Sequence, residues 1–298
     1  VEFWYNLGVK RVILSRELSL EEITEIHARV SGMELESFVH GAICIAYSGR
    51  CLLSNYFNHR DANQGTCTNS CRWEYDIHEE KGKDMEEYVP IKGQYAIEEK
   101  QRDGELMPVE EDEHGTYIMN SKDLRAIEFL GPMKKAGVIS FKIEGRSKSI
   151  YYLSLVTRAY RRAIDDLEEN RKFNPSLIEE IGKTANRGFT SAFLISAANR
   201  ETERFDSPQE SNQPQIFGGQ VVNERSGWME VDVRNRIELG DEAECLSPSG
   251  QYKFKINAME TIAGESISVA HGGNGTVWVQ ADGPVEPYAL LSLLKNTA

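Results

Sequence analysis

Apolar positions in the first part of the chain follow two periods, one typical of buried strands and one typical of amphipathic helices. Residues 11–15 form a short run rich in β-branched side chains, which predicts a buried strand. Ser19 and Glu22 form a capping box ahead of apolar residues at helical spacing, and Gly32 ends that segment. Residues 34–40 alternate as a second strand. The pattern therefore predicts a strand–helix–strand unit.

The same order of elements returns after residue 115. We expect a strand at 116–119, a helix capped by Asn120 or Ser121 that carries Leu124, Ile127 and Leu130, a strand at 138–143, a long helix over 153–167, and a shorter helix from Asn174 to about Arg187. This order is typical of parallel strands joined by helices. About four such strands are too few to close an eight-stranded barrel. The simplest interpretation is an α/β fold that holds the C-terminal half of a TIM-like (β/α)8 barrel.

The pattern changes in the last third of the chain. Residues 207–214 are polar and lack any period, which is typical of a linker. Six short strand-like runs follow between glycine-rich turns, at 220–222, 228–234, 241–246, 251–259, 266–270 and 276–281. Even spacing of this kind predicts a small antiparallel barrel or sandwich, and of the two we expect a β-barrel domain. We therefore expect a barrel portion at 1–190, a linker at 191–215 and the β domain at 216–298.

Composition narrows the class of protein. The 298 residues, 40% of them hydrophobic, suit about two globular domains. The sequence has no apolar run of roughly 18 residues and no signal peptide, so we expect a cytoplasmic protein without a membrane partner. The net charge of −13 argues against indiscriminate binding to polyanions, and we expect no DNA partner.

That charge is spread unevenly. An acidic insert at 76–113 holds 14 acidic and 5 basic residues, whereas 134–172 holds 10 basic and 5 acidic residues. The second segment has two interpretations. It can form a basic surface for a polyanion, or it can be a solvated helix face on which Arg161 and Arg162 pair with Asp165 and Asp166 at i+4 spacing.

Four of the five cysteines lie within 28 residues, as Cys44, Cys51, Cys67 and Cys71. A reducing cytoplasm disfavours a disulfide framework there, and four clustered thiolates suit either tetrahedral zinc or an iron–sulfur cluster. Zinc ribbons usually have two short Cys–Cys spacings, and only the last pair here is short, which favours iron–sulfur. Cys245 lies far away on a strand-like run, and we expect it to be a buried apolar residue.

Fixed residue types around these cysteines carry a resemblance. The matching positions are Glu36, Phe38, Gly41 to Cys44, Gly49, Cys51, Leu53 and Ser54, followed by 60–67, 71–75, 120–124 and 141–146. Together they resemble the peptidase U32, or collagenase-like, family over nearly the whole chain. Within that family the sequence looks most like the branch that makes 5-hydroxyuridine at the wobble position of tRNA.

The resemblance implies a fold, a cofactor and a reaction. It implies a TIM-like barrel followed by a β domain, with a 4Fe–4S cluster on Cys44, Cys51, Cys67 and Cys71, and zinc as the alternative metal. It implies hydroxylation of tRNA with prephenate as co-substrate, while relatives that act on ribosomal RNA or on a quinone ring give alternative substrates. Family members carry about half a barrel ahead of the position of Val1, so we expect the N-terminal part of the family barrel to be absent here.

Candidate site residues come from the ends of predicted strands, where barrel enzymes carry their chemistry. As catalytic residues we expect His40, Lys142, Glu144 and Arg146, and as substrate-binding residues Arg16, Arg50, Asn63, Asn120 and Lys122. Arginine binds carboxylate and phosphate in a bidentate manner, which suits prephenate or RNA. For each charged residue a structural salt bridge is the alternative. Asn120 is equally suited to capping a helix, and His40 to orienting the cysteine loop by hydrogen bonding.

Two other functions remain open from the sequence. A U32-type peptidase would need an activated nucleophile or a metal-bound water, yet the chain has neither a G-x-S-x-G nor an H-E-x-x-H motif. A zinc-stabilised RNA-binding module is the second alternative, although the strands of the β domain combine few aromatic and basic residues. The sequence therefore favours an iron–sulfur-dependent RNA-modifying enzyme.

Overall fold

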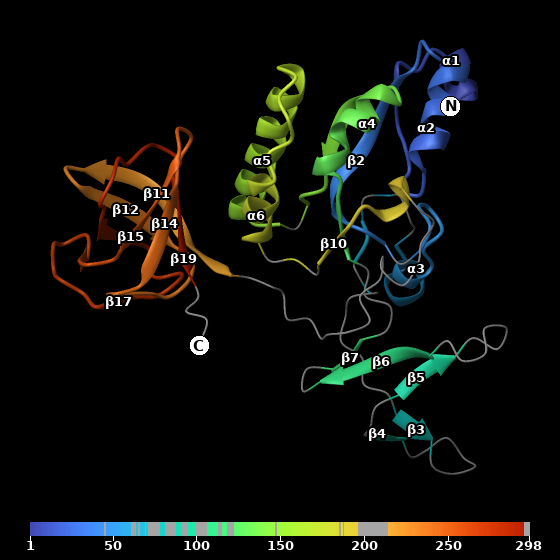
Figure 1. Ribbon diagram of the computed structural model, residues 1–298. Coiled ribbons are helices and arrows are strands. Elements are labelled where there is room, and N and C mark those ends of the chain that lie inside the picture. The colour runs from blue at the N-terminus through green and yellow to red at the C-terminus, as the bar shows by residue number, and fades with distance from the viewer. Residues whose placement is uncertain are drawn as a thin grey trace. The chain divides into compact units, whose positions relative to one another are not determined.

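The computed structural model describes residues 1–44, 46–60, 64, 66–68, 70, 78–80, 88–90, 95–98, 106–112, 115–117, 122–146, 148–184, 186, 188–195 and 214–294. The chain divides into two compact units (Figure 1). The first comprises Val1–Lys148, Thr157–Ile178 and Asn186–Asn212, and the second comprises Ser149–Val156, Glu179–Ala185 and Gln213–Ala298. Each unit has its own principal sheet.

The elements ahead of residue 200 alternate between strands and helices. In chain order they are α1 (Glu2–Asn6), β1 (Arg11–Ile13), α2 (Leu20–Arg29), β2 (Glu34–Ala42), α3 (Leu53–Asn58), β3 (His78–Glu80), β4 (Tyr88–Pro90), β5 (Tyr95–Glu98), β6 (Leu106–Asp112), β7 (Gly115–Tyr117), β8 (Asp123–Arg125), η2 (Ile127–Phe129), α4 (Leu130–Lys135), β9 (Val138–Ile143), α5 (Ile150–Glu168), α6 (Ser176–Gly182), β10 (Phe189–Thr190) and η3 (Ala192–Leu194). Strands β3 to β7 form two small antiparallel sheets in and just after the acidic insert.

Strand β2 organises the sheet of the first unit. Both β1 and β9 pair with it in parallel, with Val12 opposite Leu35 and Phe141 opposite Ser37. Helix α2 connects β1 to β2, and its predicted capping box is present, because the Glu22 N–H donates to Ser19 Oγ at 3.2 Å. The predicted strand–helix–strand unit and the predicted strand at 138–143 are therefore confirmed.

The two faces of β2 differ in character. Leu35 and Val39 are both 0% exposed, and they belong to the apolar side of the strand. Glu36, Phe38 and His40 alternate with them and therefore point to the opposite face. The face with Leu35 and Val39 packs in the core, and the opposite face carries the polar side chains.

The predicted start of the helix near residue 120 is wrong. Asp123–Arg125 forms strand β8, which pairs antiparallel with His40–Ala42 of β2 and parallel with β10, and helical structure begins only at Ile127. Helical spacing of Leu124 and Ile127 suggested otherwise. The backbone of β2 extends beyond β1 and offers hydrogen-bonding groups there, and β8 satisfies them, so sheet pairing overrides the local pattern.

The first unit therefore has an α/β fold whose sheet contains both parallel and antiparallel strands. Three of its strands, β1, β2 and β9, are parallel, as the predicted barrel portion requires. Strand β8 runs antiparallel to β2, which an ideal (β/α)8 barrel would not contain.

The second unit is an antiparallel sheet that curls on itself (Figure 1). Its strands are β11 (Gln215–Arg225), β12 (Trp228–Val233), β13 (Ile237–Glu238), β14 (Glu242–Leu246), β15 (Gln251–Lys255), β16 (Met259–Glu260), β17 (Val269–Ala270), β18 (Thr276–Gln280) and β19 (Leu290–Leu294). Seven of them form one sheet in the order β15-β14-β19-β11-β12-β18-β16, and β13 pairs with β17. The two end strands do not pair with each other within residues 214–294, so the sheet is open.

Most of the predicted β-domain strands are confirmed, with two corrections. The run at 251–259 is divided into β15 and β16, and strands β13 and β19 were not predicted. Residues 290–294 read Leu-Leu-Ser-Leu-Leu and lack the alternation of a half-buried strand, because β19 lies in the middle of the sheet between β14 and β11 and is buried on both faces.

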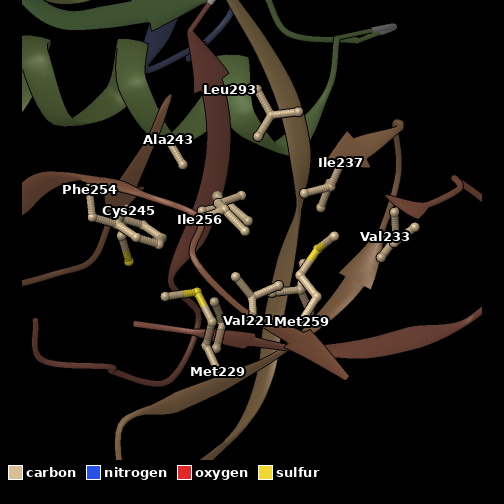
Figure 2. Packing of buried hydrophobic residues seen from close by; sticks show 14 of the residues in the cluster. Val221, Met229, Val233, Ile237, Ala243, Cys245, Phe254, Ile256, Met259 and Leu293 are labelled. Atoms are coloured by element: carbon tan, nitrogen blue, oxygen red, sulfur yellow. The ribbon is translucent and has the colours of Figure 1, made fainter. Parts of the chain in front are cut away.

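Figure 2 shows the core of the second unit, where side chains from several strands meet. Met229, Ile237, Ile256 and Cys245 are each 0% exposed. Burial raises the pKa of the Cys245 thiol. The prediction that Cys245 is a buried apolar residue is therefore confirmed.

Gly41 allows β2 and the end of β9 to approach closely. Its φ is +118°, and a Cβ at this position would lie 2.5 Å from the Cβ and 2.8 Å from the carbonyl oxygen of Glu144. The Glu144 N–H donates to the His40 carbonyl at 2.9 Å. Glycine is needed here both for the backbone conformation and for the space.

We predict that Gly41→Ala lowers the free energy of unfolding by on the order of 2–3 kcal/mol, because it adds a clash to the strain of a positive φ. Gly8→Ala is the matched control, since Gly8 has φ +85° and a Cβ added there would meet nothing within 4 Å. It should cost only about 1 kcal/mol. Chemical denaturation measures both variants, and equal losses would contradict the close approach of Glu144.

Candidate functional site

Charged side chains of the first unit gather where its parallel strands end. Arg16 follows β1, Glu144 follows β9, and the end of β2 lies between these strands at His40 and Gly41. The carboxyl ends of parallel strands share one edge of a sheet, which is where α/β proteins place their sites. Four of the predicted site residues therefore meet at or near this edge: Arg16, His40, Lys142 and Glu144.

Arg16 and Glu144 form an ion pair across this edge. Arg16 Nη2 lies 3.2 Å from Glu144 Oε2, and the two side chains are 14% and 32% exposed. The Arg146 backbone N–H donates to the other carboxylate oxygen, Oε1, at 3.4 Å. Residues far apart in the sequence thus hold one partly buried carboxylate in place.

Lys142 is held by a second carboxylate, that of Glu36. Lys142 Nζ donates to Glu36 Oε1 at 3.2 Å, and Ser140 Oγ donates to Oε2 at 2.9 Å. Burial alone would raise the pKa of Glu36, but the hydrogen bonds from Ser140 and Lys142 and the charges of Lys142 and Arg11 outweigh it and lower the pKa. Glu36 therefore stays ionised and keeps a charged partner for Lys142.

Phe38 lies among these charges. The Arg16 guanidinium carbon is 3.8 Å from the centroid of the Phe38 ring, and Lys142 Nζ is 5.5 Å from it. Both distances suit cation–π attraction. No role was predicted for Phe38 or Glu36 from the sequence. Both alternate with His40 on one face of β2, and this alternation could have indicated that they belong to the site.

His40 is fully buried at the end of β2. Its Nδ1 lies 3.3 Å from the hydroxyl of Tyr160, and its ring also contacts Phe189. The Tyr160 hydroxyl donates to the Val39 carbonyl at 2.6 Å, so its single proton is used there. The same hydroxyl oxygen accepts from the Ala126 N–H at 3.2 Å, and the role of His40 Nδ1 as donor or acceptor depends on the tautomer of the imidazole.

The protonation state of His40 limits its chemistry. Burial, together with the positive charges of Lys148 and Arg125, lowers the pKa of His40 to about 3. The imidazole is therefore neutral near pH 7 and cannot act there as an imidazolium acid. Its hydrogen bond to a buried tyrosine suits the orienting role that the sequence left open for it.

The cysteine loop follows β2 directly. Cys44 and Cys67 are exposed and Cys51 is half-buried, while Cys71 lies outside the described residues. No group of three His, Cys, Asp or Glu side chains close enough to hold a metal occurs in the part of the chain that the structure describes. The predicted ligand set therefore remains a prediction.

Two sets of contacts fix the loop to the rest of the first unit. The Glu17 carboxylate accepts a 2.6 Å hydrogen bond from the Ser48 N–H, midway between Cys44 and Cys51. Asn58 of α3 donates to Thr68 Oγ1 at 3.1 Å, next to Cys67. The segment that carries Cys67 is therefore tied to the helix that begins two residues after Cys51.

The remaining predicted residues have less defined surroundings. Arg50 is exposed on the cysteine loop, and Lys122 is half-buried ahead of β8. Asn63 and Asn120 lie outside the described residues.

The basic segment at 134–172 is largely paired. Lys134 binds Glu168, Arg161 binds Asp165, and Arg171 binds Asp166, each with an N–O distance of 2.6 Å. The predicted pair of Arg161 with Asp165 is therefore confirmed, whereas Asp166 pairs with Arg171. Exposed pairs of this kind contribute about 0–1 kcal/mol each, so their role is to neutralise charge more than to stabilise.

Within the described residues, no helix is long and apolar enough to cross a membrane.

Models of two protein-family domains match this chain. The sequence model of peptidase family U32 matches residues 1–204, and that of the peptidase family U32 C-terminal domain matches residues 213–292. The two matches fall on the region of the parallel sheet and on the antiparallel sheet. The chain belongs to peptidase family U32.

Several curated proteins are similar to this chain. It is 46% identical over 312 residues to tRNA hydroxylation protein P of Escherichia coli K12, covering 98% of this chain and 69% of that protein. It is 42% identical over 316 residues to tRNA hydroxylation protein P of Haemophilus influenzae, with the same coverage of both. It is 29% identical over 268 residues to 23S rRNA 5-hydroxycytidine C2501 synthase of Escherichia coli K12, covering 87% of this chain and 36% of that protein.

We predict that His40 makes stability depend on pH. The folded pKa is about 3 and that of an unfolded histidine is near 6.5, so between these values the unfolded chain binds the extra proton. The free energy of unfolding should therefore fall as pH drops from about 6.5 toward 3, by up to about 1.4 kcal/mol per pH unit from this residue. Denaturant unfolding across this range should show a shallower slope for His40→Gln. Parallel curves for the two proteins would refute a buried neutral His40.

Proposed function

We propose that this protein is an RNA-hydroxylating enzyme whose substrate is the wobble uridine of tRNA, which it converts to 5-hydroxyuridine with prephenate as co-substrate. One observation carries the proposal: two curated tRNA hydroxylation proteins are 46% and 42% identical to the chain over 98% of its length. Identity at that level extends through both the parallel and the antiparallel sheet. The relative that acts on 23S rRNA makes ribosomal RNA the second candidate substrate, at 29% identity.

The chemistry of the donor set fits an iron–sulfur cluster. We propose that Cys44, Cys51, Cys67 and Cys71 hold a 4Fe–4S cluster. The described members, Cys44, Cys51 and Cys67, lie on one loop and its flanks, each at least partly exposed, and thiolates are the ligands that such clusters require. When bound, a cluster supplies electron transfer or a Lewis-acidic iron. Glu17 and Asn58 hold the segments that carry these cysteines.

The charged edge of the first sheet supplies the proposed co-substrate site. Arg16 and Lys142 are the cations that would bind the carboxylates of prephenate, and Glu144 is the partner that holds Arg16 until the ligand arrives. His40 orients the end of β2. We propose that Arg146 and Arg50 contact the co-substrate or RNA phosphate, together with Asn63, Asn120 and Lys122.

Peptidase activity is the alternative that the family name carries. Serine and cysteine peptidases need a nucleophile hydrogen-bonded to a histidine base. The contacts of His40 at the proposed site include Tyr160 and Phe189, and its low pKa makes it a weak base. This favours RNA hydroxylation over proteolysis.

The proposal extends to architecture and location. We infer that residues 1–190 form the C-terminal half of a TIM-like (β/α)8 barrel, that 191–215 link it onward, and that 216–298 form a small β-barrel domain. The parallel strands β1, β2 and β9 and the curled antiparallel sheet support this. A tRNA substrate and described cysteines that form no disulfide suit a cytoplasmic protein.

We predict that protein purified without oxygen is brown and contains about four iron and four sulfide per chain. Cys51→Ala should remove most of both, because it deletes one ligand. Cys245→Ala is the matched control, since Cys245 is buried in the core of the second unit, and it should keep the full content. Elemental analysis and absorption spectra measure these values. Stoichiometric zinc without sulfide would refute the cluster.

We predict that the gene restores 5-hydroxyuridine derivatives to tRNA in a strain that lacks its own copy. Nucleoside mass spectrometry measures the modification. Cys51→Ala should abolish the signal and Cys245→Ala should retain it. Unchanged tRNA, with 5-hydroxycytidine appearing in ribosomal RNA instead, would move the proposed substrate to ribosomal RNA.

A further inference from the structure

Phe38 is an apolar ring on a charged face. It is half-buried, and its neighbours on the same side of β2 are Glu36 and His40, whereas the core-facing positions are Leu35 and Val39. A residue that only filled the core would belong on the other side of the strand. The placement of this ring therefore needs another explanation.

The ring lies against two cations of the proposed co-substrate site. It is 3.8 Å from the Arg16 guanidinium carbon and 5.5 Å from Lys142 Nζ. A guanidinium that stacks on an aromatic ring has its plane fixed, so its N–H groups point outward along that plane. Phe38 thus sets the direction in which Arg16 can donate hydrogen bonds.

Arg16 has donors to spare. Its side chain is only 14% exposed, yet within the described part of the chain it donates a single hydrogen bond, from Nη2 to Glu144. Its Nε is buried and has no hydrogen-bond partner there. A structural arginine with this burial usually has its donors satisfied. Nε and Nη2 are also the pair of donors that a carboxylate binds in a bidentate manner.

Lys142 is kept in the same cluster by Glu36, which also accepts from Ser140. Glu36 balances the charge of Lys142 while no ligand is present. Lys142 is 38% exposed, so its ammonium group remains accessible. The cluster thus combines one pre-oriented guanidinium with one accessible ammonium around a single ring.

We propose that Phe38 is a positioning residue that orients Arg16 and Lys142 to bind a carboxylate ligand at the C-terminal edge of β1, β2 and β9. The inference rests on the proposed function for its ligand, prephenate, whose two carboxylates suit two cations. If the ring were purely structural, replacing it would lower stability and leave ligand binding unchanged. If the ring positions the two cations, replacing it lowers ligand affinity.

Titration calorimetry with the full protein tests this, using prephenate and malonate as probes. Replacement of Phe38 by Leu keeps an apolar side chain but removes the π face, and the Kd for both probes should rise roughly tenfold. Phe38→Tyr keeps the π face and should bind within about twofold of wild type. In the hydroxylation assay Phe38→Leu should raise the KM for prephenate and leave kcat unchanged.

Fluorinated phenylalanines at position 38 provide a test that does not depend on how well Phe38→Leu folds. Successive fluorine atoms weaken the negative ring face and leave the shape almost unchanged, so affinity for both probes should fall with each added fluorine. Equal affinity across the series would overturn the positioning role, and so would a wild-type protein that binds neither probe. Phe38-dependent binding of malonate without prephenate-dependent hydroxylation would support the positioning role and refute the proposed co-substrate.

Discussion

The backbone pairing of β2 with β1, β8 and β9 is the constraint on which the rest of the first unit depends. Parallel pairing with β1 and β9 brings Arg16 and Glu144 to one edge, and Gly41 lets the end of β9 approach closely enough for Glu144 to reach Arg16. The same strand continues directly into Cys44. One strand thus carries the core on one face, the charged cluster on the other, and the cysteine loop at its end.

The residues on the charged face of β2 differ in burial and in charge, and these differences set what each can do. His40 is deep enough to be neutral and is tied to Tyr160, so it fixes geometry. Glu36 is ionised because hydrogen bonds outweigh the cost of burial. The cationic groups of Arg16 and Lys142 lie close to an aromatic ring, where water screens them less. The result is a small, partly desolvated surface suited to carboxylate recognition.

The sequence predicted the elements that depend on interactions between residues close together in the chain. The capping box at Ser19, the alternation over 34–40 and the β-branched run at 138–143 each correspond to an observed element. Two of the missed strands show why. Strand β8 forms because β2 offers it a partner far away in the sequence, and β19 is buried on both faces, so its residues do not alternate. From the sequence, Arg16 and Glu144 could be placed only at the same edge of the sheet. Their ion pair and the contact of Arg16 with the Phe38 ring became visible in the three-dimensional structure. The ligand role of the four clustered cysteines stays a prediction that rests on their spacing.

The central claim is that this chain hydroxylates RNA with a carboxylate co-substrate bound at the edge of β1, β2 and β9. Reconstitution tests it most directly. Purified cluster-loaded protein is incubated with an unmodified tRNA transcript, with and without prephenate, and 5-hydroxyuridine at the wobble position is measured by mass spectrometry. The account predicts product only when prephenate is present, with at least a tenfold loss for Arg16→Ala. Hydroxylation that proceeds equally well without prephenate, or peptide hydrolysis without any RNA product, would contradict it.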